Sequence, residues 1–252
     1  MSFWLKAVDR REVRYPPAPQ GQILYAIGDI HGRADLLRRA HSAIDDDVAE
    51  RCARDRATEV YLGDYVDRGP DSKGVLDLLI ARSEIAPIIA LRGNHEIAME
   101  SFLRGLLPFE EWRPLGGLET IRSYGVDARS LLEKGPIQPV DFAREIPVSH
   151  LRFFSTLKLL WRIGRYCFVH AGLKPGIPIE QQSTDDLVWI REEFLNSAGD
   201  FGAIVVHGHS PVQAIEFLPN RINIDTGAYA TNRLSVIRID ADGVSALEPA
   251  SR

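Results

Sequence analysis

The chain has 252 residues, 28.2 kDa in mass, and its shares of hydrophobic (45%) and charged residues (26%) are those of an average folded domain. This composition excludes a wholly disordered or fibrous chain. The net charge of −5 disfavours nonspecific electrostatic binding to nucleic acid or to an anionic membrane. The two cysteines, Cys52 and Cys167, have neither CxxC nor zinc-finger spacing, which disfavours a disulfide scaffold and a thiolate zinc site.

The N-terminal segment has none of the features of a secretory signal peptide, and no apolar run reaches the roughly 18 residues that span a bilayer. We therefore expect a cytoplasmic protein without a membrane partner. Residues 1–22 are predicted to form an N-terminal arm, with Phe3, Trp4 and Leu5 packed on the body, and a proline-rich connector. Residues 23–252 are predicted to form one domain.

The first half of the chain alternates between strand and helix patterns. Short apolar runs predict strands over residues 23–30, 59–66 and 85–93, and helical spacing predicts helices over 34–52, 72–82 and 95–103. This β-α-β-α-β order indicates parallel strands with helices packed over them.

The second half changes character. Residues 106–157 are rich in helix formers, Gly and Pro and predict a helical insert of several short helices. The last third predicts antiparallel strands, with hairpins at Gly164 and over residues 241–243; the strands cover residues 157–164, 165–172, 203–210, 221–228, 233–240 and 243–248. The whole pattern indicates an α/β (α+β) fold in which two mixed sheets pack face to face and are flanked by helices.

Polar residues follow the predicted strands at the points where those strands end. They are Asp29 and His31 after the first strand, Asp64, Asp67 and Arg68 after the second, Asn94, His95 and Glu96 after the third, and His170, His207 and His209 later in the chain. Ligands of open α/β sheets gather at the carboxyl ends of the strands, so these side chains should converge on one site.

This set of side chains suits metal ions. Carboxylates, neutral imidazoles and an amide oxygen, with no thiolate, are typical ligands of manganese, iron or zinc. One carboxylate between two imidazole-bearing motifs can bridge two metals, which can then share a water and clamp phosphoryl oxygens. Two dications outweigh the charges of Asp29 and Asp64, so even an acidic chain can hold a locally positive phosphate pocket.

The blocks GDIHG, GDYVDRG and RGNHE, with HAG and GHS downstream, resemble the signature blocks of the phosphoprotein phosphatase (PPP) family of metallophosphoesterases. The resemblance runs from about Ile23 to Val236, and PLGGLETIRSYG and DLVWIREEF further resemble its bacterial and phage branch. It implies a four-layer metallo-dependent phosphatase fold for a single catalytic domain over residues 23–252. It also implies two divalent or trivalent metal ions, manganese first, with iron or zinc as alternatives.

The resemblance also implies a role for each matching residue. The implied metal ligands are Asp29 and His31 for one ion, Asp64 as the bridge, and Asn94, His170 and His209 for the other. His95 is the implied general acid, oriented by Asp67, while Arg68, Arg191 and Asn94 are implied to bind the substrate phosphate. The implied reaction is in-line attack by a metal-bridging hydroxide, without a covalent intermediate.

Several residues keep open alternatives. His207 is interpreted as a supporting residue rather than a ligand, and His41 and His150, which lie outside every motif, as surface or capping residues. Arg92 fits a structural salt bridge as well as a phosphate contact, and Tyr229 follows a late strand near the expected site.

The first functional hypothesis is hydrolysis of phosphoserine or phosphothreonine in proteins, with phosphotyrosine also considered. The alternative is a dinucleoside polyphosphate hydrolase of the diadenosine tetraphosphate type, built on the same metal core. A non-catalytic phosphate-binding module is a remote third, because no expected ligand is missing. The residues that select between phosphopeptides and dinucleotides are expected within 106–157 and 172–182.

Overall fold

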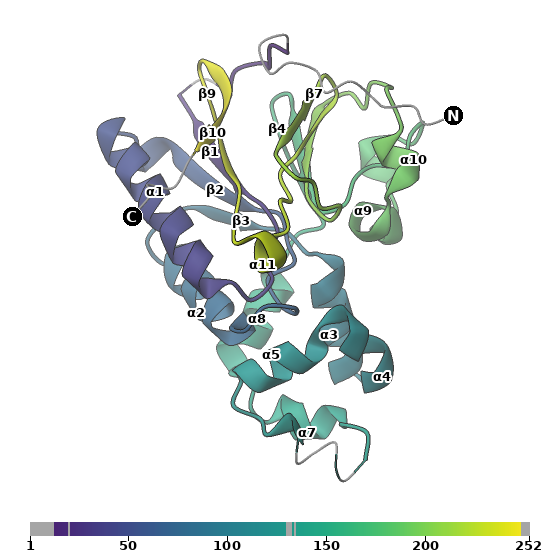
Figure 1. Cartoon of the computed structure of the whole chain (residues 1–252). Helices are drawn as coiled ribbons and strands as arrows, with labels where there is room; N and C mark the ends of the chain where they lie inside the picture. The colour runs from purple at the N-terminus through teal and green to yellow at the C-terminus, as the bar shows by residue number, and fades with distance from the viewer. Residues whose placement is uncertain (1–12, 20, 130–132, 134, 248–252) are drawn as a thin grey trace.

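The computed structural model describes residues 13–19, 21–129, 133 and 135–247, so the predicted packing of Phe3, Trp4 and Leu5 lies outside the described residues. Two five-stranded sheets lie face to face, and helices cover the outer face of each, as Figure 1 shows with α1 and α2 beside one sheet and α9 and α10 beside the other. The predicted fold class is therefore confirmed.

The first sheet has the strand order β10-β9-β1-β2-β3. Its strands are β1 (Ile23–Ile27), β2 (Ala57–Tyr61), β3 (Ile88–Ala90), β9 (Val236–Asp240) and β10 (Gly243–Leu247). β1, β2 and β3 are parallel, whereas β9 pairs antiparallel with both β1 and β10. The predicted parallel unit and the last hairpin are both present.

The second sheet has the order β4-β5-β6-β8-β7. Its strands are β4 (Leu160–Ile163), β5 (Tyr166–Val169), β6 (Ile204–His207), β7 (Glu216–Leu218) and β8 (Arg221–Asn223). The β4–β5 hairpin is as predicted, but β5, β6 and β8 are parallel, so the prediction of an antiparallel last third is wrong there. Short helices cross over between β5 and β6, and their few residues give too little periodicity to be seen in the sequence.

Three helices are long: α1 (Ala34–Glu50) connects β1 to β2, α2 (Ser72–Ser83) connects β2 to β3, and α3 (Asn94–Leu103) leads from β3 into the insert. The predicted insert forms several short helices, α4 (Phe109–Trp112), η2 (Arg113–Leu115), α5 (Gly117–Ser123), α7 (Pro139–Ala143) and α8 (Val148–Thr156). The remaining ones are η1 (Arg54–Arg56), η3 (Ile179–Gln181), α9 (Thr184–Trp189), α10 (Glu192–Leu195) and α11 (Ala228–Thr231). Across the described residues, no helix has the length and apolar character that crossing a membrane requires.

Strand alternation explains the layers. In β1, Leu24 and Ala26 face the second sheet, while Tyr25 and Ile27 belong to the core under the helices. Because every residue of β1 is buried, the strand reads as a continuous apolar run instead of an alternating one. The core between the sheets fixes their mutual position, and with it the loops at their edges.

Two histidines outside the motifs correct an expectation. His41 and His150 are buried, not surface residues: the Nε2 of His41 lies 2.8 Å from the Tyr61 hydroxyl, and the Nδ1 of His150 lies 2.7 Å from the Tyr124 hydroxyl. Each imidazole has a tyrosine hydroxyl as its partner, so both histidines connect secondary-structure elements and take no part in the strand-end site.

Candidate metal centre and active site

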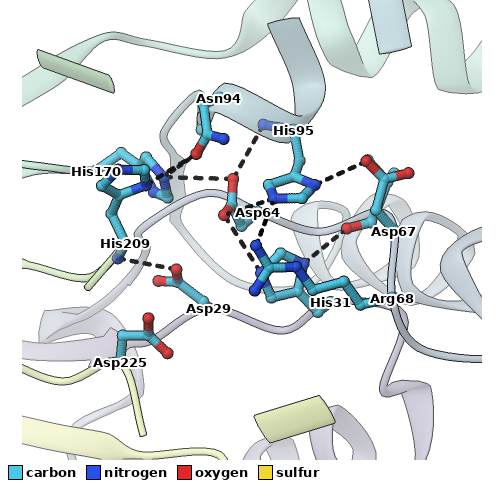
Figure 2. Close-up of polar contacts among 12 residues, drawn as sticks. Asp29, His31, Asp64, Asp67, Arg68, Asn94, His95, His170, His209 and Asp225 are labelled. Atoms are coloured by element: carbon cyan, nitrogen blue, oxygen red, sulfur yellow. Dashed lines mark hydrogen bonds and ion pairs between the residues drawn. The ribbon is translucent and has the colours of Figure 1, made fainter. Parts of the chain in front are cut away.

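The loops that follow β1, β2, β3, β5 and β6 bring the motif side chains to one place. Figure 2 shows Asp64 in the middle, with Asn94 and His170 on one side and His31 and His95 on the other. All five side chains are at most 3% exposed. The convergence expected from the carboxyl ends of the strands is therefore present in the fold.

Backbone strain concentrates at this place. In the described part of the chain, seven residues other than glycine have a positive φ, a conformation that costs free energy. Five of the seven belong to the predicted site, namely His31, Asp64, Asp67, Arg68 and His209. The surrounding structure must hold these residues in place, which is the pattern expected where side-chain direction matters for function.

Two motif glycines make room for carboxylates. A Cβ on Gly93 would lie 2.1 Å from Oδ1 of Asp64, and a Cβ on Gly208 would lie 1.9 Å from Oδ1 of Asp29. Real Cβ atoms do not approach this closely, so any larger residue would displace the carboxylate. The glycines next to the Asn-His and His-Ser pairs thus allow the backbone to pass directly behind the two acids.

A substitution tests this packing. Gly208→Ala is expected to push the Asp29 carboxylate away and to lower both metal affinity and hydrolysis by at least about 10-fold, because supporting residues of a metal site typically contribute that much. Gly199→Ala is the matched control, since its Cβ would be 3.3 Å from the nearest atom, Oγ of Ser197. Metal content by mass spectrometry and hydrolysis rate are the readouts. Wild-type values for Gly208→Ala would contradict the packing argument.

The ligand atoms form two groups that share Asp64. His31, Asp64 and His95 make one potential metal-binding group, and Asp64, His170 and His209 make the other. The Nε2 of His31 lies 3.4 Å from one Asp64 oxygen, and the Nε2 of His170 lies 3.3 Å from the other. A carboxylate with one oxygen toward each group has the placement that a bridge between two ions requires.

Asp29 belongs to neither of these groups, and Asn94 lies beside the second one. The Oδ1 of Asn94 lies 3.0 Å from both Nε2 of His170 and Nδ1 of His209, so it faces the second group. The backbone amide of His209 donates to Oδ2 of Asp29, but Oδ1 of Asp29 and Nε2 of His209 are buried without a hydrogen-bond partner among the described residues. Orphaned buried acceptors of this kind fit a bound cation.

The pKa values of the side chains at the site also favour binding of metal cations. Burial lowers the pKa of His31 to about 3 and holds the pKa of His170 and His209 below the usual value, so the three imidazoles keep a lone pair for a metal. Burial and the nearby carboxylates of Asp225 and Asp64 raise the pKa of Asp29 well above its usual range. Carboxylates packed this closely repel one another, and bound dications would relieve that repulsion.

His95 is held differently from the other imidazoles. Its Nδ1 lies 2.7 Å from Oδ2 of Asp67, and its Nε2 lies 3.2 Å from Nη2 of Arg68. Burial works against a charge on His95, yet Asp64 and the hydrogen-bonded Asp67 outweigh it and raise the pKa above the usual value. An imidazole that favours its protonated form, with one nitrogen fixed by a buried carboxylate, can serve as a proton donor.

The two predicted phosphate-binding arginines border the centre. Arg68 is partly buried beside His95, and its guanidinium lies 4.9 Å from the ring centre of Tyr229. Arg191 is exposed, and its Nη1 donates to Oγ of Ser210 over 3.3 Å. Both side chains place positive charge at the rim of the metal-binding groups, as an anionic substrate requires.

The structure shows the contacts of the motif-flanking residues whose roles the sequence left open. Arg92 donates to Glu100 and to the Phe154 carbonyl and is therefore a structural residue. His207 is buried against the Phe194 ring and belongs to neither metal-binding group, in agreement with a supporting role. Glu96 accepts hydrogen bonds from the backbone amides of Asp64, Tyr65 and Gly93 and so ties two motif loops together.

Three residues at the site have no role predicted from the sequence, although Thr120 lies in the PLGGLETIRSYG block and Trp189 in the DLVWIREEF block. Trp112 and Thr120, from the helical insert, hydrogen-bond to the Asp67 carboxylate. Trp189 is 44% exposed and packs edge-on against the His209 ring at 6.0 Å between ring centres. A tryptophan or threonine within an ordinary helix pattern looks like a core residue, so only its three-dimensional neighbours could identify it.

Fold and site together define a metal-dependent phosphoesterase, a hydrolase with candidate ligand groups for a dinuclear metal centre. The family model of calcineurin-like phosphoesterases matches residues 24–244. The chain belongs to this family, whose members use a dinuclear metal centre. The expected relationship to PPP-type metallophosphoesterases is thereby confirmed.

Individual relatives differ in activity. A symmetrical bis(5'-nucleosyl)-tetraphosphatase from Dechloromonas aromatica is 32% identical over 153 residues, which cover 60% of this chain but only 44% of that relative's length. Serine/threonine-protein phosphatase 1 from Salmonella typhimurium is 27% identical, covering 86% of this chain and 91% of that protein. A crystal structure of a proposed diadenosine tetraphosphatase shares the fold, with a TM-score of 0.63, 22% identity and coverage of 95% and 98% of the two chains.

Proposed function

We propose that the chain is a dinuclear-metal phosphomonoesterase that hydrolyses phosphoserine and phosphothreonine, and secondarily phosphotyrosine, in proteins. One observation carries this proposal: the 2.7 Å contact between His95 and the buried Asp67 carboxylate, next to the two metal-binding groups. The alkoxide that leaves from a serine or threonine ester is strongly basic and must be protonated. A preorganised proton donor is therefore most valuable for such substrates.

In this proposal the ligands divide between two ions. Asp29 and His31 hold the first ion, Asp64 contacts both, and a set of three residues holds the second: Asn94, His170 and His209. When bound, the two metals supply Lewis acidity toward the phosphoryl oxygens and lower the pKa of a water molecule. The chain fixes the ligand positions through the strained backbone and the close glycine contacts described above.

His95 acts as the general acid in this scheme and not as a metal ligand. Its Nε2 faces the metal-binding groups 3.8 Å from Asp64, so a ligand role is sterically open. However, the Arg68 guanidinium beside the same nitrogen would repel a metal cation, whereas it can attract a phosphate oxygen. Arg68 also opposes a charge on His95 itself, but Asp64 and Asp67 outweigh it and raise the imidazole pKa. His95 thus gives its Nε2 proton to the leaving oxygen while Asp67 keeps the Nδ1 side fixed.

Arg68 and Arg191 orient the phosphate, together with the Asn94 amide. The two guanidinium groups approach from different elements, the loop after β2 and the segment between α9 and α10. Planar guanidinium groups can each offer two parallel N–H donors to phosphate oxygens, which fixes the substrate for in-line attack.

A second candidate is hydrolysis of dinucleoside polyphosphates, and a specific observation favours it. Two exposed aromatic rings pack against imidazoles of different metal-binding groups: Trp189 against His209, and Tyr229, 39% exposed, against His31 at 5.4 Å. A flat ring on each side of the metal centre would suit a substrate with a base at both ends, because bases stack on aromatic side chains. The tetraphosphatase relative supports the same alternative.

A rate comparison separates the two candidates. We expect manganese-loaded protein to hydrolyse phosphoserine and phosphothreonine peptides with a higher kcat/KM than diadenosine tetraphosphate, and Trp189→Ala to leave that order unchanged. Leu106→Ala, which removes another exposed apolar side chain, is the control. A preference for the dinucleotide that is lost in Trp189→Ala would contradict the first proposal and establish the second.

A further inference from the structure

Two side chains of the helical insert hydrogen-bond to Asp67, the carboxylate that contacts His95. This carboxylate is completely buried, and its Oδ2 accepts from both Nδ1 of His95 and, over 3.0 Å, the indole Nε1–H of Trp112. Its Oδ1 accepts from the Thr120 hydroxyl over 2.7 Å. Each oxygen of the carboxylate is therefore held by a side chain that lies 45 or 53 residues further along the chain.

The backbone of Asp67 is held by the same elements. Its amide lies 2.8 Å from Oγ1 of Thr120 and 3.0 Å from Oγ of Ser72, and these two hydroxyls are 3.0 Å apart. Asp67 has a φ of 72°, so its conformation is one that the chain adopts only under constraint. The hydroxyl pair supplies that constraint on the backbone while the Thr120 proton holds the side chain.

The Trp112 indole is itself fixed in place. It is completely buried and packs on the Phe102 ring at 4.9 Å and on the Phe142 ring at 5.9 Å between ring centres. A Cβ on Gly117 would lie 2.4 Å from the indole, and a Cβ on Gly116 would lie 2.3 Å from the Arg68 amide nitrogen. The paired glycines of the PLGGLET block thus allow the insert to close on both the indole and the Asp67–Arg68 turn.

We propose that Trp112 and Thr120 are positioning residues that lock the Asp67 carboxylate, and through it the His95 imidazole, in the orientation for proton transfer to the leaving group. This inference rests on the proposed role of His95 as the general acid. Neither residue touches substrate or metal in this scheme. The insert is then part of the proton-donating machinery and not only a candidate wall for substrate selection.

The experiment compares two substrates that differ in their need for a proton. A phosphoserine peptide releases a basic alkoxide, whereas p-nitrophenyl phosphate releases a stable phenolate. We expect Trp112→Phe and Thr120→Val to lower kcat on the peptide by roughly 10- to 100-fold, the range typical of supporting partners, and to lower it much less on the aryl ester. Thr120→Ser keeps the hydroxyl and should restore the rate on the peptide.

Two controls separate positioning from general damage. Metal content by mass spectrometry should match the wild type in all three variants, because no ligand is changed. Trp161→Phe removes another indole, one in the core between the sheets, and should leave the ratio of the two rates unaltered. If Trp112→Phe does not fold, the Thr120→Val and Thr120→Ser pair carries the test alone.

The outcomes also distinguish this inference from the proposed function. Equal losses on both substrates, or no loss on either, in Thr120→Val and Trp112→Phe would overturn the positioning role. Asp67→Asn serves as the reference, since it changes the carboxylate directly. If Asp67→Asn shows a strong substrate difference while the other two variants show none, only the positioning role fails. If Asp67→Asn itself shows no difference, the acid role of His95 fails.

Discussion

Asp64→Asn will lose bound metal and hydrolytic rate together. The two oxygens of Asp64 face different imidazoles, His31 and His170, so this single side chain serves both metal-binding groups. The amide preserves the shape but removes the negative charge and one acceptor. We expect a loss larger than the roughly 10- to 100-fold that supporting residues of metal sites contribute, because a shared ligand is removed.

Metal content and rate must be measured on the same Asp64→Asn preparation, with thermal unfolding as a check that the fold persists. Asp46→Asn is a suitable control, since it makes the same chemical change on the exposed face of α1. Full occupancy of two ions in Asp64→Asn, or an unaltered rate, would show that the two groups do not share this ligand.

His95→Asn should lose rate but keep its metals. Removal of a general acid typically lowers the rate by about 10²–10⁴-fold, and the loss should shrink on p-nitrophenyl phosphate, whose leaving group needs less protonation. His95 also lies within ligand distance of His31 and Asp64, so the opposite result is structurally possible. If His95→Asn emptied a metal site and left the rate of the remaining enzyme intact, His95 would be a ligand and the acid assignment would be wrong.

The convergence of the motif side chains could be predicted from the sequence because each of them closely follows a strand. The membership of the groups could not, since His95 and not Asp29 stands with His31 and Asp64. Position after a strand fixes the edge of the sheet on which a side chain lies, and parallel strands bring their carboxyl ends to one edge. Asp29, His31 and Asp64 accordingly lie close together at that edge (Figure 2). Glycine beside a ligand is a further local signal, since Gly208 and Gly93 are required by close contacts with carboxylates.

The residues that contact and position the site side chains could not be predicted in this way. Trp112 and Thr120 approach Asp67 from separate short helices, and that approach depends on how the insert folds onto the first sheet. Trp189 likewise ends a six-residue helix whose position follows from packing against β5 and β6. Contacts of this kind are tertiary, and neither residue spacing nor composition encodes them locally.

The dependence on tertiary contacts also explains where the predicted fold differs from the structure. The strand β7 is absent from the predicted strands because it has only three residues at the edge of its sheet, too few for a period of two to appear. The parallel pairing of β5 with β6 needs a crossover, and the crossover here is made of helices of six residues or fewer, which give little helical periodicity. The sequence favours surface or capping roles for His41 and His150, because buried histidines have no distinct pattern when their partners are tyrosines 20 and 26 residues away.

Metal removal and reconstitution is the most direct test of a two-metal hydrolase. The protein should be stripped exhaustively with a chelator, assayed on a phosphoserine peptide, and assayed again while manganese is titrated back. We expect no hydrolysis by the stripped protein and full recovery at two ions per chain. Full activity of the exhaustively stripped protein in excess chelator would contradict the account, whatever its substrate preference.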